Sequence, residues 1–297
     1  MPADFVISAT PSARRLAHCS LVDRPQVPEV IPPLPEPGQE IVVKLGRRAA
    51  PAQTVFSPSR RASNQLLRTL SRNVFEALAP WIREVEFGYG ETLFEAGDDV
   101  CEAYFPLDGM VIGLVLPLTD GRTVEVATIG REGAVGGIVS LGYKPAFTRG
   151  VVQIGGKAAR ISVSRIETAK RVSPRLHDIL TRYADCLAAQ VLQSVGCAMV
   201  HPLEARCARW LLMMHDRLQH SAIPLTQEAQ AEMFGVARTY MTRTAKALQR
   251  QGAISYRRGV IQIENRAILE AAACECYETV RQHFDKVLPG LYPGLEP

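Results

Sequence analysis

The sequence predicts an α+β protein in which an antiparallel β-roll is followed by a long helix and a winged helix-turn-helix domain. Three observations predict this fold class. Short runs rich in Val, Ile and Phe, separated by glycines, fill residues 84–165. A stripe of apolar residues at helical spacing then covers 173–200, and the pattern helix, glycine turn, basic helix and hairpin occupies 226–263. At roughly 150 residues a domain, 297 residues make about two domains.

Residues 1–62 are predicted to form a disordered, proline-rich tail. The first 60 residues hold ten of the 20 prolines, and each proline removes a backbone donor and fixes φ. Two other interpretations stay open. The arginine pairs at 47–48 and 60–61 could make the tail an arm that touches nucleic acid, or the start codon could be assigned too far upstream.

The β-roll is predicted over residues 63–170. A helix over Asn64–Ile82, interrupted near Pro80, precedes short strands with Asp-Gly turns at 108–109 and 120–121. Neither a phosphate-binding loop nor a strand–GxGxxG–helix unit occurs in the sequence, which argues against nucleotide-hydrolysing and dinucleotide-binding folds.

A long helix is predicted between residues 171 and 201. Ser173 is a suitable N-cap, Pro174 suits the first helical position, and the His201-Pro202 step ends the helix. The apolar stripe consists of Leu176, Leu180, Tyr183, Leu187, Val191, Val195 and Ala198. A narrow stripe of this length predicts pairing with a second copy of the chain in a homodimer. The alternative is a helix packed on its own roll.

Residues 202–297 are predicted to be a winged helix-turn-helix domain. Thr226 can cap a short helix over Gln227–Met233, and a tight turn at 235–237 leads into a second helix from Arg238 to about Gln251. The hairpin over 254–263 is the expected wing. The second helix of such a unit can lie in the major groove with its N-terminal residues on base edges.

The predicted partner of this domain is double-stranded DNA. Between 226 and 263, six Lys and Arg residues oppose two Glu, which leaves a local charge of +4. The residues expected to contact DNA are Arg238, Thr239, Tyr240, Thr242, Arg243, Lys246, Arg257 and Arg258. The alternative is a helical hairpin with a solvated basic face.

Composition and residue spacing argue against several other classes. The apolar runs are too short for a membrane span. The net charge of +4 is too small to indicate a particular kind of partner by itself. No Ser-His-Asp set or carboxylate pair can be argued from spacing, so neither an enzyme nor catalytic residues are expected. Seven scattered cysteines without a CxxC pair favour free thiols in a reducing cytoplasm.

No metal site and no cofactor are predicted. The six histidines form no metal-binding pair by spacing. Cys274 and Cys276 fall in a helix expected to begin near Arg266, where residues two apart point about 200° from each other and cannot chelate one ion. Structural thiols are therefore expected, with redox switching as the alternative.

The stretch from about 64 to 285 resembles the Crp–Fnr superfamily of bacterial transcription regulators. The resemblance is carried by GETLFEAGD at 90–98, DGM at 108–110, DGR at 120–122, IGREGAVGG at 129–137, HPLEARCARWLL at 201–212 and LTQEAQAEMFGVARTYMTRTAKALQRQGAI at 225–254. It implies a cyclic-nucleotide-type roll, a dimerisation helix, a winged DNA-binding domain and RNA polymerase as a partner.

The match departs from the family at the effector pocket. Family members that bind a cyclic nucleotide place a Glu on the ribose and an Arg on the phosphate, where this sequence has Gly137 and Thr148, with Arg149 one residue out of register. A vestigial pocket is expected at Glu132, Gly136, Gly137, Thr148 and Arg149. An iron–sulfur sensor is excluded because no cysteine cluster precedes the roll.

The sequence therefore predicts a homodimeric, sequence-specific transcription regulator with an unknown effector that is not a cyclic nucleotide. Two rival hypotheses remain. The first is a genuine cyclic-nucleotide receptor, and the second is an interaction scaffold that uses the long helix and leaves DNA alone.

Overall fold

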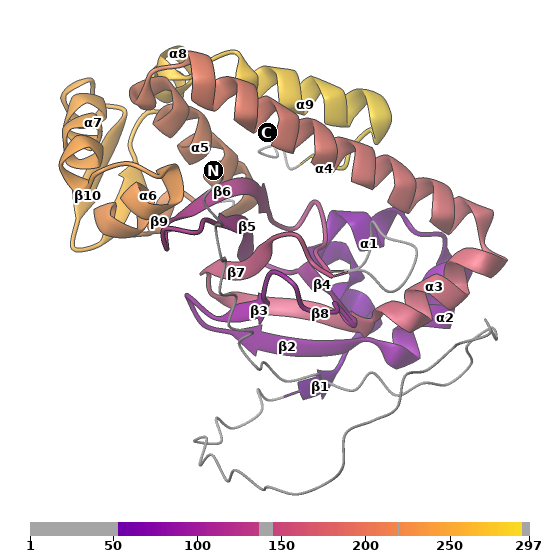
Figure 1. Cartoon of the computed structure of the whole chain (residues 1–297). Coiled ribbons are helices and arrows are strands. Elements are labelled where there is room, and N and C mark those ends of the chain that lie inside the picture. The colour runs from indigo at the N-terminus through magenta and orange to yellow at the C-terminus, as the bar shows by residue number, and fades with distance from the viewer. Residues whose placement is uncertain (1–52, 137–144, 219, 293–297) are drawn as a thin grey trace, which may run out of the picture. The chain divides into compact units, whose positions relative to one another are not determined.

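The computed structural model describes residues 53–136, 145–218 and 220–292 (Figure 1). The strands are β1 Gln53–Val55, β2 Arg83–Phe87, β3 Thr92–Phe94, β4 Glu102–Pro106, β5 Val111–Pro117, β6 Thr123–Ile129, β7 Arg149–Ile154, β8 Gly156–Ser162, β9 Ala222–Pro224, β10 Ile254–Arg257 and β11 Val260–Ile263. The helices are α1 Gln65–Thr69, α2 Arg72–Leu78, α3 Val163–Val172, α4 Pro174–Val200, α5 Leu203–Leu218, α6 Gln227–Phe234, α7 Arg238–Arg250, α8 Arg266–Ala272 and α9 Cys276–Val287, with short 3-10 helices at Pro58–Ser63 and Ala79–Trp81.

The predicted α+β fold is confirmed. Two four-stranded antiparallel sheets, ordered β1-β2-β8-β4 and β3-β7-β5-β6, form the roll. A third sheet, ordered β10-β11-β9, belongs to the C-terminal part of the chain, which we call the winged domain (α5 to α8). Its third strand, β9, extends the expected two-stranded wing. No helix in the described ranges is long and apolar enough to cross a bilayer.

Ordered structure begins before the predicted boundary at residue 63. Strand β1 pairs with β2 in the antiparallel register Gln53 opposite Val85. Phe56 is only 2% exposed and meets Phe75 edge to face, with 6.3 Å between the ring centroids. Burying an aromatic ring here anchors the segment. The predicted disorder is therefore wrong for residues 53–62, and residues 1–52 lie outside the described residues.

The helix predicted over Asn64–Ile82 is divided into α1, α2 and a 3-10 turn. Leu70 takes an extended conformation with ψ 145°, which ends α1. Asn64 caps α1 by accepting a hydrogen bond from the Leu67 amide, while its side-chain amide donates to the Pro106 and Gly133 carbonyls at 2.9 Å each. The division lets both short helices bury apolar side chains in the same core.

Helix α4 has the predicted ends. The Ser173 hydroxyl accepts a hydrogen bond from the Leu176 amide, and His201 leaves the helix with ψ 143° before Pro202. The predicted stripe divides into two parts. Its first members, Leu176 and Tyr183 among them, are buried in the chain's own core, as the alternative interpretation expected. The large apolar side chains that α4 leaves exposed are Leu192, Val195, Met199 and Val200, of which only Val195 belongs to the predicted stripe.

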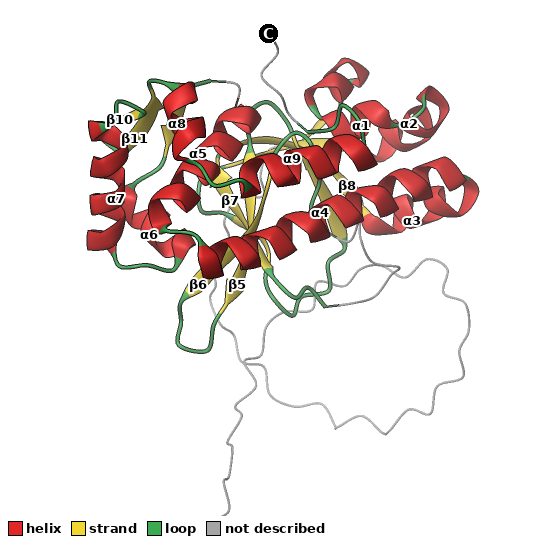
Figure 2. Cartoon of the chain, turned by 90° about the horizontal axis from the view of Figure 1, so that it is seen from above, coloured by secondary structure: helices red, strands yellow, loops and turns green. Residues whose placement is uncertain are grey.

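The C-terminal helix predicted from Arg266 is two helices. Ala273, with ψ 153°, ends α8, and α9 begins at Cys276. Cys274 therefore precedes α9, and its sulfur lies within 4.8 Å of the Cys276 sulfur. The expectation that these two thiols diverge is wrong, because it assumed one continuous helix. Helix α9 then runs along α4 (Figure 2).

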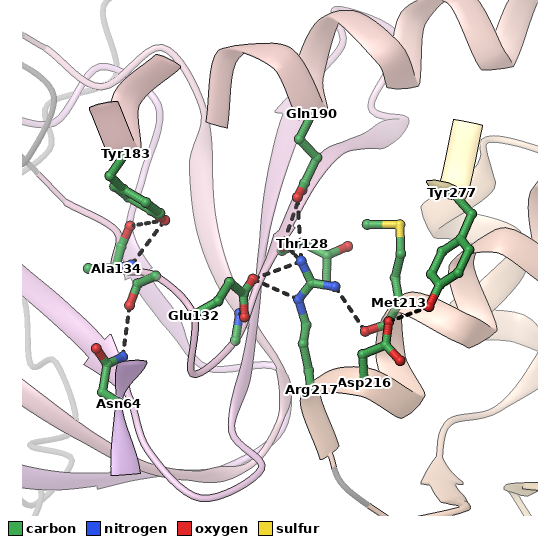
Figure 3. Close-up of polar contacts among 12 residues, drawn as sticks. Asn64, Thr128, Glu132, Ala134, Tyr183, Gln190, Met213, Asp216, Arg217 and Tyr277 are labelled. Atoms are coloured by element: carbon green, nitrogen blue, oxygen red, sulfur yellow. Dashed lines mark hydrogen bonds and ion pairs between the residues drawn. The ribbon is translucent and has the colours of Figure 1, made fainter. Parts of the chain in front are cut away.

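One buried ion pair joins the roll to α5 (Figure 3). The Arg217 side chain, 0% exposed, contacts the Glu132 carboxylate at 2.7 Å and 2.8 Å, and Glu132 is 2% exposed. Arg217 also donates to the carbonyls of Met213 at 2.9 Å and Thr128 at 3.0 Å, and Gln190 of α4 donates to the same Thr128 carbonyl. The pair thus lies in a polar network contributed by the roll, α4 and α5.

Two glycines of the IGREGAVGG segment make room for these contacts. A Cβ on Gly130 would lie 2.7–2.9 Å from the aliphatic part of the Arg217 side chain. A Cβ on Gly133 would collide with the Tyr183 ring, whose hydroxyl accepts from the Ala134 amide at 3.0 Å and donates to its carbonyl at 2.9 Å. These glycines let α4 and α5 approach the loop closely.

We expect Arg217→Leu to reduce the free energy of unfolding by about 3–5 kcal/mol, because it leaves the Glu132 charge buried without a partner. Urea unfolding of the full chain measures this loss. The double variant Glu132→Leu/Arg217→Leu should recover much of it, since no uncompensated charge remains.

The control is Arg182→Leu, which removes an exposed pair with Asp178 and should cost less than about 1 kcal/mol. If Arg217→Leu unfolds at the same urea concentration as this control, the buried pair does not hold the roll and α5 together.

Candidate nucleic-acid interface

The helix-turn-helix is formed by α6 and α7, and both ends of α6 are specified locally. The Thr226 hydroxyl accepts a hydrogen bond from the Ala229 amide at 3.2 Å, as the sequence predicts. Gly235 takes the left-handed conformation with φ 64°, which a side chain would strain. This turn sets the direction in which α7 begins at Arg238.

Helix α7 has one buried and one exposed face. Met241, Thr244, Ala245 and Leu248 are buried in the winged domain. The structure brings five of the six candidate residues on α7 to its exposed surface: Arg238, Thr239, Tyr240, Arg243 and Lys246. Thr242 differs, because it is half-buried and its hydroxyl donates to the Gln227 side chain at 2.8 Å. Thr242 therefore ties α7 to the start of α6.

The wing is a hairpin with a two-residue turn. Strands β10 and β11 pair with Arg257 opposite Val260, so Arg258 and Gly259 form the turn. Both have positive φ, 50° and 79°, as in the turn type that matches the twist of a hairpin. The side chains of Arg257 and Arg258 are exposed at its tip.

Positive charge dominates this surface. Of the two acidic residues between 226 and 263, Glu228 lies 3.7 Å from Arg238, with both side chains exposed, and Glu232 accepts from Thr123 of β6 at 3.2 Å. An exposed ion pair such as Glu228–Arg238 contributes little to stability, so it does not hold the arginine away from a ligand. The arrangement can therefore attract a polyanion and present arginine and threonine donors to it.

The predicted effector pocket has a different organisation from the one expected. Glu132 is engaged by Arg217 and by the Gly130 amide, both buried, so its carboxylate faces the winged domain. Arg149 at the start of β7 pairs with Glu95 at 2.6 Å. Gly136 has φ 84°, and a Cβ there would collide with the Glu102 carbonyl. Thr148 precedes β7, and Gly137 lies outside the described residues.

The partners of Glu132 could not be predicted from the sequence. Arg217 lies 85 residues away, and its neighbour Asp216 accepts a hydrogen bond from Tyr277 at 2.7 Å and contacts Arg266 at 2.9 Å. The sequence signal is a pair of charged residues that, with His215, interrupts the apolar helical run at 210–218.

The described residues join a β-roll to a winged helix-turn-helix, a motif whose second helix can lie in the major groove of DNA. Residues 205–272 match the family model of the Crp-like helix-turn-helix domain. The comparison with curated proteins finds no match. The family match thus assigns a Crp-like helix-turn-helix domain to residues 205–272, and solved structures of Crp–Fnr regulators share the fold.

Three solved structures illustrate the shared fold. FixK2 from Bradyrhizobium japonicum is 17% identical over 64% of this chain and 96% of its own, with a TM-score of 0.57. A CRP-family transcriptional regulator from Thermus thermophilus is 18% identical over 63% of this chain and 95% of its own, with a TM-score of 0.54. The c-di-GMP-responsive global regulator CLP of Xanthomonas campestris is 15% identical over 66% and 100%, with a TM-score of 0.51. The last two are described as regulators of transcription or gene expression.

Proposed function

We propose that the protein is a homodimer that reads a two-fold-related DNA site with its two α7 helices and responds to an effector other than a cyclic nucleotide. The observation that carries this proposal is the exposed basic surface formed by α7 and the wing tip on one helix-turn-helix core. RNA polymerase is the proposed protein partner, and the cytoplasm the proposed compartment.

The proposed roles on DNA follow from position. Arg238, Thr239 and Arg243 lie toward the N-terminal end of α7, which in this motif contacts base edges. The guanidinium of Arg243 suits bidentate contact with guanine. Arg257 and Arg258, on a hairpin tip, suit phosphates and carry no base information.

The proposed dimer seam is the second half of α4. Leu192, Val195 and Met199 are 72%, 57% and 81% exposed and follow one another at steps of three and four residues. Gly196 lies beside them with open space where a Cβ would be, which suits close approach of a second helix. Large apolar side chains at this spacing and exposure are typical of an interface.

One residue type and two contacts support an effector other than a cyclic nucleotide. Thr148 offers no charge to a phosphate, Arg149 is paired with Glu95, and Glu132 is paired with Arg217. We propose that the roll, over residues 63–170, senses a signal and that the winged domain, from residue 202, moves about the His201-Pro202 step.

We expect Arg243→Ala to cost about 1–3 kcal/mol of specific binding and to relax the preference at one base pair. Affinities for a set of operator variants, measured in competition with random DNA, give this result. Unchanged relative affinities across the set would show that Arg243 reads no base.

The matched control is the wing double variant Arg257→Ala/Arg258→Ala. It should weaken binding to all sequences alike and flatten the slope of log affinity against log salt by about two units per subunit at most. A slope near zero for the unmodified protein would favour the scaffold hypothesis instead.

We expect Leu192→Glu to convert the dimer to a monomer, because two carboxylates would meet in an apolar seam. Sedimentation equilibrium measures the mass. The control is Arg175→Glu, exposed at the start of α4, which should stay dimeric. A Leu192→Glu protein with the mass of a dimer would show that the seam lies elsewhere.

We expect an excess of cyclic AMP or cyclic GMP to leave the thermal midpoint and the DNA affinity unchanged. Without an arginine to pair with the phosphate, the free energy of nucleotide binding is less favourable by about 3–5 kcal/mol. A site of micromolar affinity then becomes one of near-millimolar affinity or weaker. A ligand that barely binds the native state cannot stabilise it. A saturable shift at micromolar nucleotide that Arg149→Ala abolishes would instead support the receptor hypothesis.

A further inference from the structure

Four metal-ligand side chains meet where α4 ends. Cys197 lies in the last turn of α4, and His201, four residues later, is the C-cap residue whose amide donates to the Cys197 carbonyl. Cys274 and Cys276 reach them from the junction between α8 and α9. The ligand atoms of all four residues lie within 4.8 Å of one another, and the three cysteines are buried.

The spacing of these atoms suits one tetrahedral ion. Sulfur ligands about 2.3 Å from a zinc ion lie about 3.8 Å from each other. Here Cys197 Sγ and Cys274 Sγ are 3.5 Å apart, and Cys276 Sγ is 3.5 Å from His201 Nδ1. A cluster of several irons and sulfides would hold its four ligands farther apart.

Neighbouring side chains already occupy the positions of an outer shell. The second ring nitrogen of His201, Nε2, lies 3.1 Å from the Glu275 carboxylate. Histidine ligands of metals typically donate that N–H to a carboxylate, which fixes the tautomer and orients the ring. The Gln193 side-chain amide donates to Cys276 Sγ at 3.0 Å, as expected for a sulfur that carries negative charge.

Arg209 supplies the matching positive charge. Its Nε and one Nη are buried without a hydrogen-bond partner. Its charge acts on the Cys197 sulfur. Three thiolates and one divalent ion leave a single negative charge, which a guanidinium would balance.

We propose that Cys197, His201, Cys274 and Cys276 bind one zinc ion in each chain, with His201 coordinating through Nδ1 and Glu275 as its positioning residue. Three thiolates and one imidazole suit zinc better than the hard cations calcium and magnesium, which take oxygen ligands. Each thiol releases its proton when it binds the ion, so acid weakens the site. Protein side chains would fill all four coordination positions of the ion and leave none for water, which is typical of a structural zinc site.

The ion would fix the end of α4 to the α8–α9 junction, beside the His201-Pro202 step. This inference depends on the four ligands and their neighbours, not on DNA binding or on the nature of the effector. The strongest competing chemistry is a disulfide between Cys197 and Cys274, whose sulfur atoms are neighbours.

The test uses the full chain, purified under reducing conditions without a metal-affinity step. We expect close to one zinc per chain by elemental analysis. After removal of zinc with a chelator, added Co²⁺ should give the thiolate charge-transfer and intense d–d bands of tetrahedral cobalt, and zinc should bleach them. Zinc should also raise the thermal midpoint of the metal-free protein.

Variants assign the ligands. Cys276→Ser should lose stoichiometric zinc and the thiolate-to-cobalt bands, whereas Cys101→Ser, on a half-exposed cysteine beside Asp99, should keep both. Glu275→Gln leaves all four ligands in place and should weaken zinc binding by about 10–100-fold. If Cys276→Ser does not fold, the cobalt spectrum of the unmodified protein and Glu275→Gln still decide.

Three results would overturn the proposal. They are the absence of saturable zinc or cobalt binding by the reduced protein, equal loss of metal in Cys101→Ser, and a native Cys197–Cys274 disulfide, found by mass spectrometry, in protein isolated without a reductant.

Discussion

The buried Arg217–Glu132 pair is the interaction on which the arrangement of the roll and the winged domain depends. Two opposite charges have been removed from water. Their contact, together with the carbonyls of Met213 and Thr128, the side-chain oxygen of Gln190 and the amide of Gly130, offsets that cost. Separating the two side chains is costly in free energy, because each ion would then be buried without an opposite charge. The loop after β6 and the end of α5 are therefore held together, and Gly130 is required for the arginine side chain to pass.

Helix α5 is the element through which both parts of the molecule are connected. It starts at Leu203, directly after the His201-Pro202 step where the proposed zinc site lies, and it ends at Leu218, next to Arg217. Asp216 on its last turn also accepts from Tyr277 and contacts Arg266, which links it to α8 and α9. Both ends of α5 thus have polar or metal-ligand contacts to distant segments, while its middle supplies the apolar core of the winged domain.

Features set by local chemistry could be predicted from the sequence, and features set by distant partners could not. Ser173 and Thr226 cap the helices that follow them, and Gly235 turns the chain, because the atoms involved are only a few residues apart. The sequence contains no comparable signal for the partner of Glu132, which is 85 residues away. The division at Cys274 was missed for a related reason, since the apolar pattern continues through a break that tertiary contacts impose.

The buried pair also limits what the proposed effector could be. A ligand shifts a conformational equilibrium only by the difference between its affinities for the two states. A motion of α5 that separates Arg217 from Glu132 costs about 3–5 kcal/mol before any gain from new contacts, as for any buried ion pair that loses one partner. A reversal from 1:99 to 99:1 needs a preference of about 5.5 kcal/mol. A weakly bound metabolite that touches the roll alone supplies too little. An effector of the kind proposed would therefore either engage one member of the pair directly or favour a rotation in which α5 and the loop after β6 move together and the pair stays closed.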